Sequence, residues 1–312
     1  MKVMLAPMEG VVDHLMRDML TRVGGFDQCV TEFVRVVDQK LPKKTFYRLC
    51  PELCNGGKTP SGIPVRVQLL GQHPEWLAEN AQTAVELGSP GVDLNFGCPA
   101  KTVNKSKGGA VLLKETQTLY DIVKAVRDAV PSDIPVSAKI RLGFEDKSLA
   151  IDNAVAITEA GASELVVHAR TKTEGYKPPA YWDWIAKIKQ HTDIPLVANG
   201  EIWNSADAKR CQDESGCTNL MIGRGALAMP NLALCIKGDK APMPWAELAA
   251  LLIQYSGYEI FGDKGKYYPN RIKQWCGYLK RQYPEADVLF NDIRRLTKSQ
   301  DIVDVLARQA DI

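Results

Sequence analysis

The segment from Asn95 to Lys101 carries a thiol, Cys98, directly after a short apolar run, Gly91–Leu94. The run predicts a buried strand, and the residues that follow it, as far as Gly109, predict a long basic loop. Loops at the carboxyl ends of parallel strands hold the reactive groups of α/β enzymes. A lone cysteine is more often a small buried hydrophobic residue. Here glycine and proline restrain the backbone on either side of the thiol, so we expect Cys98 to take part in chemistry.

Short apolar runs that could position this loop recur along the chain, each followed by a helix-like segment. The eight predicted strands are Val3–Ala6, Cys29–Phe33, Val65–Leu69, Val92–Asn95, Val136–Ile140, Leu165–His168, Leu196–Ala198 and Leu220–Ile222. Amphipathic stretches predict helices at Pro74–Leu87, Thr116–Val130, Leu149–Ala160, Tyr181–Gln190 and Ala206–Asp213. Eight alternating units of this length fit a (β/α)₈ TIM barrel. A doubly wound open sheet is the alternative, disfavoured because no Gly-x-Gly-x-x-Gly follows the first strand.

The pattern changes near residue 240, where Gly238, Pro242 and Pro244 predict a linker. Beyond the linker the sequence predicts helices alone, at Trp245–Tyr258, Pro269–Tyr283, Glu285–Leu296 and Asp301–Gln309. We therefore expect a catalytic barrel domain over residues 1–240 and a smaller, all-helical domain over residues 241–312.

Composition excludes several classes of protein. The formal net charge of the 312 residues is +2, so no global field indicates a nucleic-acid partner, and any such surface must be local. Eight cysteines without a Cys-x-x-Cys pair, beside only four histidines, argue against a metal site and for a reduced, cytoplasmic protein. No apolar stretch is long enough to span a membrane or to serve as a signal peptide.

Polar side chains stand at the end of nearly every predicted strand. They are Glu9, Gln68, Asn95, Lys139, Arg141, His168, Arg170, Asn199, Glu201 and Arg224. Buried polar groups are costly unless a ligand or a neighbour satisfies them. The ring of polar residues therefore indicates a binding site at the mouth of the barrel.

The last two strand ends indicate what the ligand carries. Gly200, Gly223 and Gly225 would let backbone N–H groups approach an anion, and Arg224 adds a positive charge. Because this part of such barrels commonly binds phosphate, we expect a phosphorylated cofactor. Lys139 fits a bound group that becomes anionic during turnover, as reduced flavin does. Composition alone does not separate a flavin from a sugar phosphate.

Six motifs occur together and in order: Ala6-Pro7-Met8-Glu9-Gly10, Asn95-x-Gly97-Cys98-Pro99, Lys139-Ile140-Arg141, His168-x-Arg170-Thr171, Asn199-Gly200-Glu201-Ile202 and Ile222-Gly223-Arg224-Gly225. They resemble the tRNA-dihydrouridine synthase family, and the similarity covers essentially the whole chain. The segments Glu32–Asp38 and Arg271–Trp275 are similar to its C-type bacterial branch, which modifies uridine 16 in the D-loop of tRNA. Ala169, where many relatives have glycine, is a small departure that removes no functional side chain.

The resemblance implies FMN as cofactor and NADPH as reductant, with a hydride delivered to C6 of the uracil ring and a proton to C5. The acid would be Cys98, because a thiol is mostly protonated at neutral pH. The FMN-binding residues that the resemblance implies are Pro7, Met8, Glu9, Gln68, Lys139, His168, Asn199, Gly200, Glu201, Gly223 and Arg224. It also places His168 near the substrate base, together with Asn95 and Tyr176.

A local basic surface supports RNA as the partner. From Lys264 to Arg281 there are six Lys or Arg residues and no acidic residue, interleaved with aromatic side chains. On a helix, Ile272, Trp275 and Leu279 would face inward and leave the basic side chains to reach out. Basic patches on this helix and on the barrel rim fit a phosphate backbone. The expected tRNA contacts are Arg35, Asn95, Tyr176, Arg271, Lys273, Tyr278 and Arg294, and a monomer is expected.

Two other classes stay open. A small-molecule FMN oxidoreductase of the dihydroorotate or dihydropyrimidine dehydrogenase type would share the barrel and the cofactor, but it has no need of a basic helical tail. A tRNA-binding chaperone without catalysis would have no need of Cys98 or Lys139.

Overall fold

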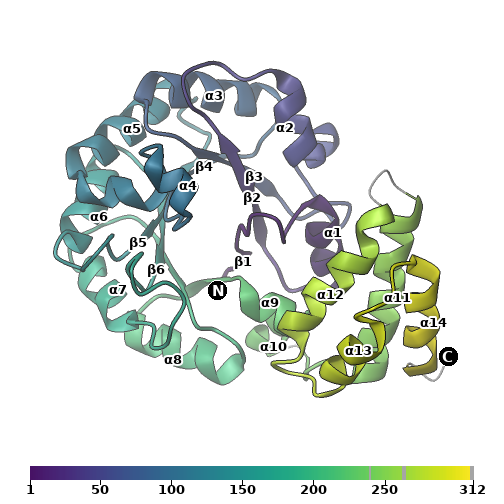
Figure 1. Ribbon diagram of the computed structural model, residues 1–312. Helices are drawn as coiled ribbons and strands as arrows, with labels where there is room; N and C mark the ends of the chain where they lie inside the picture. The colour runs from purple at the N-terminus through teal and green to yellow at the C-terminus, as the bar shows by residue number, and fades with distance from the viewer. Residues whose placement is uncertain (239, 262–264, 310–312) are drawn as a thin grey trace. The chain divides into compact units, whose positions relative to one another are not determined.

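The computed structural model describes residues 1–238, 240–261 and 265–309, so the predicted basic residue Lys264 lies outside the described part. The chain forms two compact units. The first comprises Met1–Arg22, Phe26–Ile202 and Ala206–Gly223. In it, eight parallel strands pair in chain order and close into a barrel (Figure 1). This topology confirms the predicted (β/α)₈ TIM barrel and excludes the doubly wound open sheet.

All eight predicted strands are present, and their ends lie within two residues of the predicted ones. Nearly every strand residue is buried, because each strand faces the barrel interior on one side and a helix on the other. The strands are β1 (Val3–Leu5), β2 (Gln28–Arg35), β3 (Val65–Leu70), β4 (Val92–Phe96), β5 (Val136–Arg141), β6 (Glu164–His168), β7 (Leu196–Asn199) and β8 (Asn219–Ile222).

Helices cover the outside of the barrel, as the view along its axis shows (Figure 1). Five of them were predicted: α3 (Pro74–Glu86), α5 (Thr116–Ala129), α6 (Ala150–Glu159), α7 (Trp182–Lys189) and α8 (Ser205–Ser215). The structure adds α1 (His14–Val23), α2 (Lys43–Leu49) and the 3₁₀ helix η1 (Pro51–Asn55), which the sequence pattern did not indicate.

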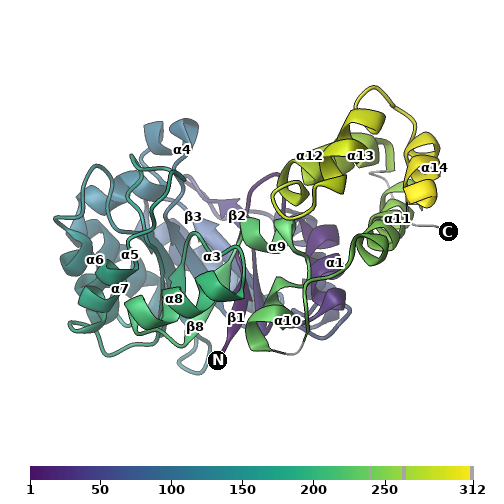
Figure 2. The same ribbon diagram turned by 90° about the horizontal axis from the view of Figure 1, so that it is seen from below.

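The segment after Cys98 differs from the predicted loop. It contains the short helix α4 (Lys101–Lys105) and the 3₁₀ helix η2 (Gly109–Lys114). Figure 2 shows α4 standing clear of the helical ring, beyond one end of the barrel. The segment folds back on itself, because the Cys98 carbonyl accepts hydrogen bonds from Asn104 Nδ2 at 2.9 Å and from the Ala110 N–H at 3.0 Å.

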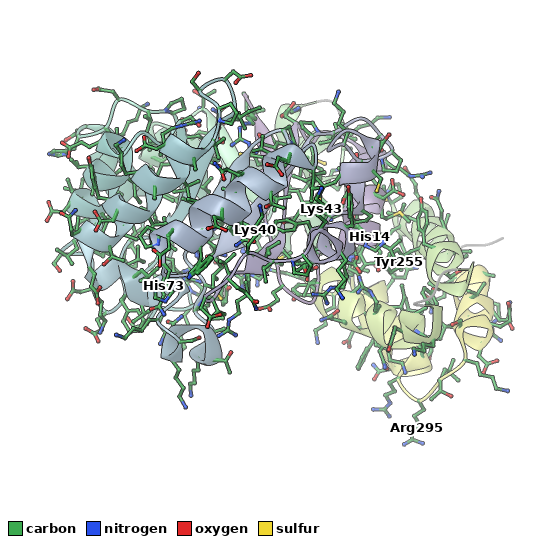
Figure 3. The ribbon with its side chains drawn as sticks, turned by 90° about the horizontal axis from the view of Figure 1, so that it is seen from above. His14, Lys40, Lys43, His73, Tyr255 and Arg295 are labelled. Atoms are coloured by element: carbon green, nitrogen blue, oxygen red, sulfur yellow. The ribbon has the colours of Figure 1, made fainter. Side chains whose placement is uncertain are left out.

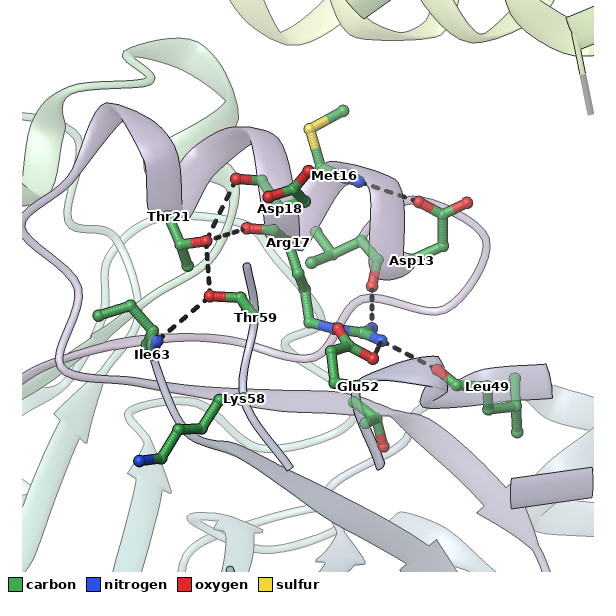
Figure 4. A network of polar contacts seen from close by, with 12 residues as sticks. Asp13, Met16, Arg17, Asp18, Thr21, Leu49, Glu52, Lys58, Thr59 and Ile63 are labelled. Atoms are coloured by element: carbon green, nitrogen blue, oxygen red, sulfur yellow. Dashed lines mark hydrogen bonds and ion pairs between the residues drawn. The ribbon is translucent and has the colours of Figure 1, made fainter. Parts of the chain in front are cut away.

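A buried polar network fastens α1 to α2 and η1 (Figure 4). Arg17 is fully buried and forms two bonds with the Glu52 carboxylate, at 2.7 and 2.9 Å, while also donating to the Leu49 carbonyl at 2.9 Å. Thr21, one turn further along α1, bonds Thr59 at 3.2 Å. Burial of a charged pair is tolerated here because every charge meets several partners.

The second unit contains Val23–Gly25, Trp203–Ser205 and the described residues from Arg224 onward. Its helices are α9 (Arg224–Ala228), α10 (Leu232–Lys237), α11 (Trp245–Phe261), α12 (Tyr268–Leu279), α13 (Glu285–Ile293) and α14 (Ser299–Gln309), with η3 (Gly265–Tyr267) before α12. Trp275 lies at the core of this unit, where its Nε1 donates to the Leu227 carbonyl at 2.9 Å. The Tyr255 ring packs edge-on against the Trp275 ring, with 5.3 Å between the two ring centres. Because α9 and α10 group with the later helices, this compact unit begins before residue 240. The division into a catalytic barrel domain over residues 1–240 and an all-helical domain over residues 241–312 stays a prediction.

Candidate active site

Cys98 lies two residues beyond β4, at the start of the segment that leads to α4. Its backbone N–H and that of Gly97 both donate to Oδ1 of Asn95, at 2.9 Å each. The thiol is partly buried, and this burial raises the pKa of Cys98, while a hydrogen bond from the backbone of Ala100 acts against the rise. A thiol held in this way keeps its proton at neutral pH and can donate it to a bound molecule.

Lys139 supplies a positive charge close to the strand ends. Its Nζ donates to Oδ1 of Asn199 on β7 at 3.0 Å, and Nδ2 of Asn199 donates to the Met221 carbonyl on β8 at 2.8 Å. Burial lowers the pKa of Lys139 to about 8, with Arg141 acting in the same direction and Asp93 against it. Because its hydrogen-bond partner is a neutral amide, this ammonium can stabilise a ligand that gains negative charge.

Gln68 and Asn95, two predicted site residues on neighbouring strands, are brought into direct contact. Nδ2 of Asn95 donates to Oε1 of Gln68 at 2.7 Å, and Nε2 of Gln68 donates to the carboxylate of Asp93 at 2.7 Å. Burial raises the pKa of Asp93 to about 6, against the hydrogen bonds from Gln68 and Ser137. Asp93 is not among the predicted site residues, although a carboxylate within the otherwise largely apolar strand Val92–Phe96 is a visible signal.

Arg141, predicted only as one of the polar residues at the strand ends, links two parts of the site. Its Nε donates to the Gly97 carbonyl at 2.8 Å, beside the thiol, and its Nη1 donates to the Gly175 carbonyl at 3.0 Å. The guanidinium lies 5.1 Å from the ring centre of Tyr176, which is 52% exposed. The buried His168 ring lies 5.9 Å, centre to centre, from the Tyr176 ring. The structure thus brings Tyr176 and His168 close together, and their placement near the substrate base stays a prediction from the resemblance.

The end of β7 makes a tight turn at Gly200 and Glu201, both with positive φ, +118° and +57°. A Cβ at Gly200 would lie 2.7 Å from Cδ2 of His168, so the backbone passes too close to the imidazole for any other residue. Glu201 forms an ion pair with the buried guanidinium of Arg170. Nη1 of Arg170 has no hydrogen-bond partner among the residues that the structure describes. The turn thus offers close backbone approach beside an unsatisfied buried donor, which suits an anionic ligand group.

The residues after β1 meet the end of β8. The Ala6 N–H donates to the Ile222 carbonyl at 2.9 Å, and the Met8 carbonyl accepts from two N–H groups of the turn that follows. A Cβ at Gly223 would lie 3.4 Å from Sδ of Met8, so these two predicted residues are neighbours. Pro7 and Met8 are partly buried and Glu9 is exposed. The structure thus places Pro7, Met8 and Gly223 along one side of the barrel mouth.

The predicted tRNA residues fall in both units. Arg35 is exposed at the end of β2 and donates to Oγ of Ser106, just after α4. Within the second unit, Arg271 and Lys273 do not simply reach out as predicted: both are partly buried, and they donate to the Tyr255 hydroxyl at 3.0 Å and to the Leu296 carbonyl at 2.6 Å. Tyr278 is partly buried and Arg294 is exposed. Arg224, a predicted cofactor residue, also belongs to this unit, where its guanidinium lies 4.9 Å from the ring centre of Trp203.

The described residues lack both a metal site and a membrane-spanning helix. None of their His, Cys, Asp and Glu side chains gather in a group of three or more that could hold a metal ion. Across the same part of the chain, every helix is too short or too polar to cross a membrane.

Comparison with solved structures gives barrel proteins at low sequence identity. The old yellow enzyme from Trypanosoma cruzi matches with a TM-score of 0.52 at 14% identity, over 78% of this chain and 89% of that one. A morphinone reductase mutant matches with a TM-score of 0.52 at 12% identity, over 78% of this chain and 88% of that one. These likenesses agree with the barrel fold and go no further than the fold.

Sequence comparison is far more specific. The chain is 60% identical over 306 residues to the tRNA-dihydrouridine(16) synthase of Shewanella oneidensis, covering 98% of this chain and 97% of that protein. It is 58% identical over 312 residues to the protein of that name in Vibrio cholerae, and 55% identical over 303 residues to that in Escherichia coli K12, with at least 96% of each chain covered. The family model described as dihydrouridine synthase matches residues 4–310. The chain therefore belongs to the dihydrouridine synthase family.

Proposed function

We propose that this protein reduces uridine 16 in the D-loop of tRNA to 5,6-dihydrouridine, with FMN as cofactor and NADPH as reductant. Relatives named tRNA-dihydrouridine(16) synthase, 55–60% identical along nearly the full chain, support the reaction and the position. The observation that carries the chemistry is the placement of two groups on adjacent strands. Cys98, a protonated thiol, follows β4, and Lys139, a buried cation, lies on β5, where it pairs in register with Asn95.

The residues at the barrel mouth fit a flavin. FMN, when bound, supplies the hydride that adds to C6 of the uracil ring. Lys139 would stabilise the negative charge of the reduced ring, and the turn at Gly200 with the unsatisfied Nη1 of Arg170 would suit a phosphate nearby. The residues proposed to hold FMN are Pro7, Met8, Glu9, Gln68, Lys139, His168, Asn199, Gly200, Glu201, Gly223 and Arg224.

Cys98 would complete the reduction by transferring the proton on Sγ to C5 of the uracil ring. Burial favours the thiol over the thiolate, so the proton is available at neutral pH. The loop N–H groups of Gly97 and Cys98 are already held by Asn95, which fixes the position from which the thiol acts. Asn95 and Tyr176 are proposed to contact the base, which must leave its stack to reach the barrel.

Exposed basic residues of the second unit are proposed to bind the tRNA backbone. Arg294 and Arg295, which follow α13, are exposed, and Figure 3 shows Arg295 extending away from the nearby helices. We expect Arg294→Ala with Arg295→Ala to weaken tRNA binding and to lower the slope of log Kd against log salt by about one for each phosphate that is no longer neutralised. Arg308→Ala on α14 is the control for removal of charge alone. A double variant with an unchanged salt slope would remove this face from the binding surface.

The activity test uses purified protein, added FMN and NADPH, and an unmodified tRNA transcript. We expect dihydrouridine at position 16, detected by mapping of the modified nucleotide, and none in a matched transcript with cytidine at that position. Reduction of free uracil or orotate as efficiently as tRNA would favour the small-molecule oxidoreductase instead. Binding of tRNA without any reduction would favour a non-catalytic tRNA-binding protein.

A further inference from the structure

A continuous line of hydrogen bonds runs from the buried carboxylate of Asp93 to the backbone beside the thiol. Asp93 lies on β4 between Gln68 of β3 and Ser137 of β5, its partners in the strand register. Oδ2 of Asp93 accepts from Nε2 of Gln68 at 2.7 Å, and Oε1 of Gln68 accepts from Nδ2 of Asn95 at 2.7 Å. Oδ1 of Asn95 then accepts from the Gly97 and Cys98 N–H groups.

The carboxylate gives this line a direction. An ionised carboxylate can only accept hydrogen bonds, whereas a side-chain amide has one donor end and one acceptor end. Facing Asp93, the Gln68 amide must present its NH₂ group, which turns its oxygen toward Asn95. The Asn95 amide must then present its own NH₂ group to Gln68, which leaves its oxygen for the loop N–H groups. Each amide orientation follows from the one before it, and the first follows from the charge on Asp93.

The other oxygen of Asp93 is fixed in the same sense. Nη1 of Arg66 donates to Oγ of Ser137 at 3.1 Å, so the hydroxyl proton of Ser137 is directed elsewhere. That proton points to Oδ1 of Asp93, which lies 2.7 Å from Oγ, because the other acceptor, the Val92 carbonyl, is more distant at 3.4 Å. Asp93 is 1% exposed, so water does not compete for either oxygen.

We propose that Asp93 is a positioning residue for Cys98: through the Gln68 and Asn95 amides, its carboxylate holds the backbone on which the thiol is carried. The inference rests on the proposed function, in which Cys98 is the proton donor. With a neutral amide at position 93, the Gln68 amide is free to turn over. The Asn95 amide then turns as well and sets its NH₂ group against the loop N–H groups, so two buried donors lose their acceptor.

Glu164 is the matched control, because it is a second buried carboxylate inside the same barrel. It pairs with Arg66 at 2.9 Å and with Lys2 at 3.2 Å, both of them charged donors. Since these partners cannot reverse their polarity, Glu164→Gln tests the loss of a buried charge. It leaves in place the hydrogen bonds that run from Asp93 through the Gln68 and Asn95 amides to the loop.

The experiment measures hydrogen exchange at the Gly97 and Cys98 amides, in protein without flavin and in protein loaded with FMN. We expect Asp93→Asn to lower the protection of both amides on the order of tenfold, and Glu164→Gln to leave it at the wild-type level. With tRNA as substrate, kcat of Asp93→Asn should fall roughly tenfold while KM for tRNA stays the same. Wild-type protection of these amides in Asp93→Asn would overturn the inference.

If Asp93→Asn does not fold, the same measurement on the wild-type protein at pH 5 and pH 8 decides the matter. The pKa of Asp93 is raised to about 6 by burial, so the carboxylate is largely neutral at pH 5. The groups facing it are Arg66 and Gln68 from β3 and Lys139 and Ser137 from β5, and Arg66 is paired with Glu164 from β6. We expect lower protection factors at pH 5, and equal ones would refute the inference.

The outcomes separate the two proposals. If Asp93→Asn lowers the protection of the Gly97 and Cys98 amides but the wild-type protein never reduces tRNA, the proposed role of Asp93 in holding the loop is supported and the proposed reaction is refuted. Reduction of tRNA by a protein in which Asp93→Asn changes neither exchange nor kcat would keep the reaction and remove the positioning role.

Discussion

The interior of the barrel contains an apolar cluster to which β1, β2, β6, β7 and β8 contribute and a polar hydrogen-bonded group along β3, β4 and β5. The apolar part is a cluster of fully or nearly buried side chains: Met4, Ala6, Val30, Val166, Val197 and Met221. The polar part holds Gln68, Asp93, Asn95, Ser137 and Lys139, bonded to one another or across the barrel mouth.

The two parts contribute differently to the stability of the protein. Apolar side chains gain free energy by leaving water, in any arrangement that packs well. Polar side chains at the same depth lose free energy unless each donor meets an acceptor, so their arrangement is fixed in direction as well as in position. The Cys98 thiol lies two residues beyond β4, one of the strands of the polar part. We infer that the apolar part supplies stability and that the polar part gives up some of it to orient reactive groups.

Removal of the thiol should produce the largest effect on turnover. We expect Cys98→Ala to reduce the rate of dihydrouridine formation by roughly 10²–10⁴-fold, because a positioned acid contributes about that much. The thermal unfolding midpoint should stay unchanged, since the side chain is only partly buried. Cys54→Ala, at the exposed cysteine of η1, is the control and should keep full activity. Equal turnover in both variants would remove Cys98 as the acid.

A change in the apolar part should lower stability and leave turnover unchanged, the reverse of the result expected for Cys98→Ala. We expect Met4→Ala to lower the free energy of unfolding by about 2–5 kcal/mol, measured by denaturant titration, because the side chain is 1% exposed and leaves a cavity. Met4→Leu nearly conserves volume and should cost less than about 1.5 kcal/mol. Turnover per folded molecule should match the wild type in both. A drop in kcat as large as that of Cys98→Ala would show that the two parts of the interior are not separate in function.

The same contrast explains what the sequence predicts well. Parallel strands are rich in apolar residues, and all eight were predicted from short apolar runs, although β3, β4 and β5 also carry polar residues. Helix α1 was missed because its inner face carries Arg17 and Thr21, both buried. These residues are stable there only through Glu52 and Thr59, partners that come from another part of the chain. Helix α4 has five residues, too few for a periodic pattern to be visible.

The candidate site divides in the same way. Cys98 and Lys139 could be predicted because residue type and place at a strand end are local properties. The relation of Asp93 to Gln68 and Ser137 depends on the register of three strands, which no local pattern contains. The partly buried state of Arg271 was missed for a similar reason, because its partner Tyr255 lies on a different helix.

The smallest expected effect is the dependence of the free energy of unfolding on pH that arises from the ionisation of Asp93. Burial raises its pKa from 3.8 to about 6, so between these values the folded protein holds a proton that the unfolded chain has released. Stability then falls as pH rises through this window, because the folded state binds more protons than the unfolded state. We expect the free energy of unfolding of the wild type, minus that of Asp93→Asn, to decrease by about 2–3 kcal/mol from pH 4 to pH 7. Subtraction of the two unfolding curves removes the carboxylates that both proteins share.

The sign of this difference tests the comparison between the two parts of the barrel. If ionised Asp93 stabilised the fold, the free energy of unfolding of the wild type minus that of Asp93→Asn would increase with pH. A purely structural role would then explain why this carboxylate is buried. A difference that shrinks with pH means that the charge costs stability near neutral pH, where its acceptor-only character is what directs the Gln68 amide. A charge kept at such a cost is explained by the orientation of the loop that carries Cys98, not by the stability of the barrel.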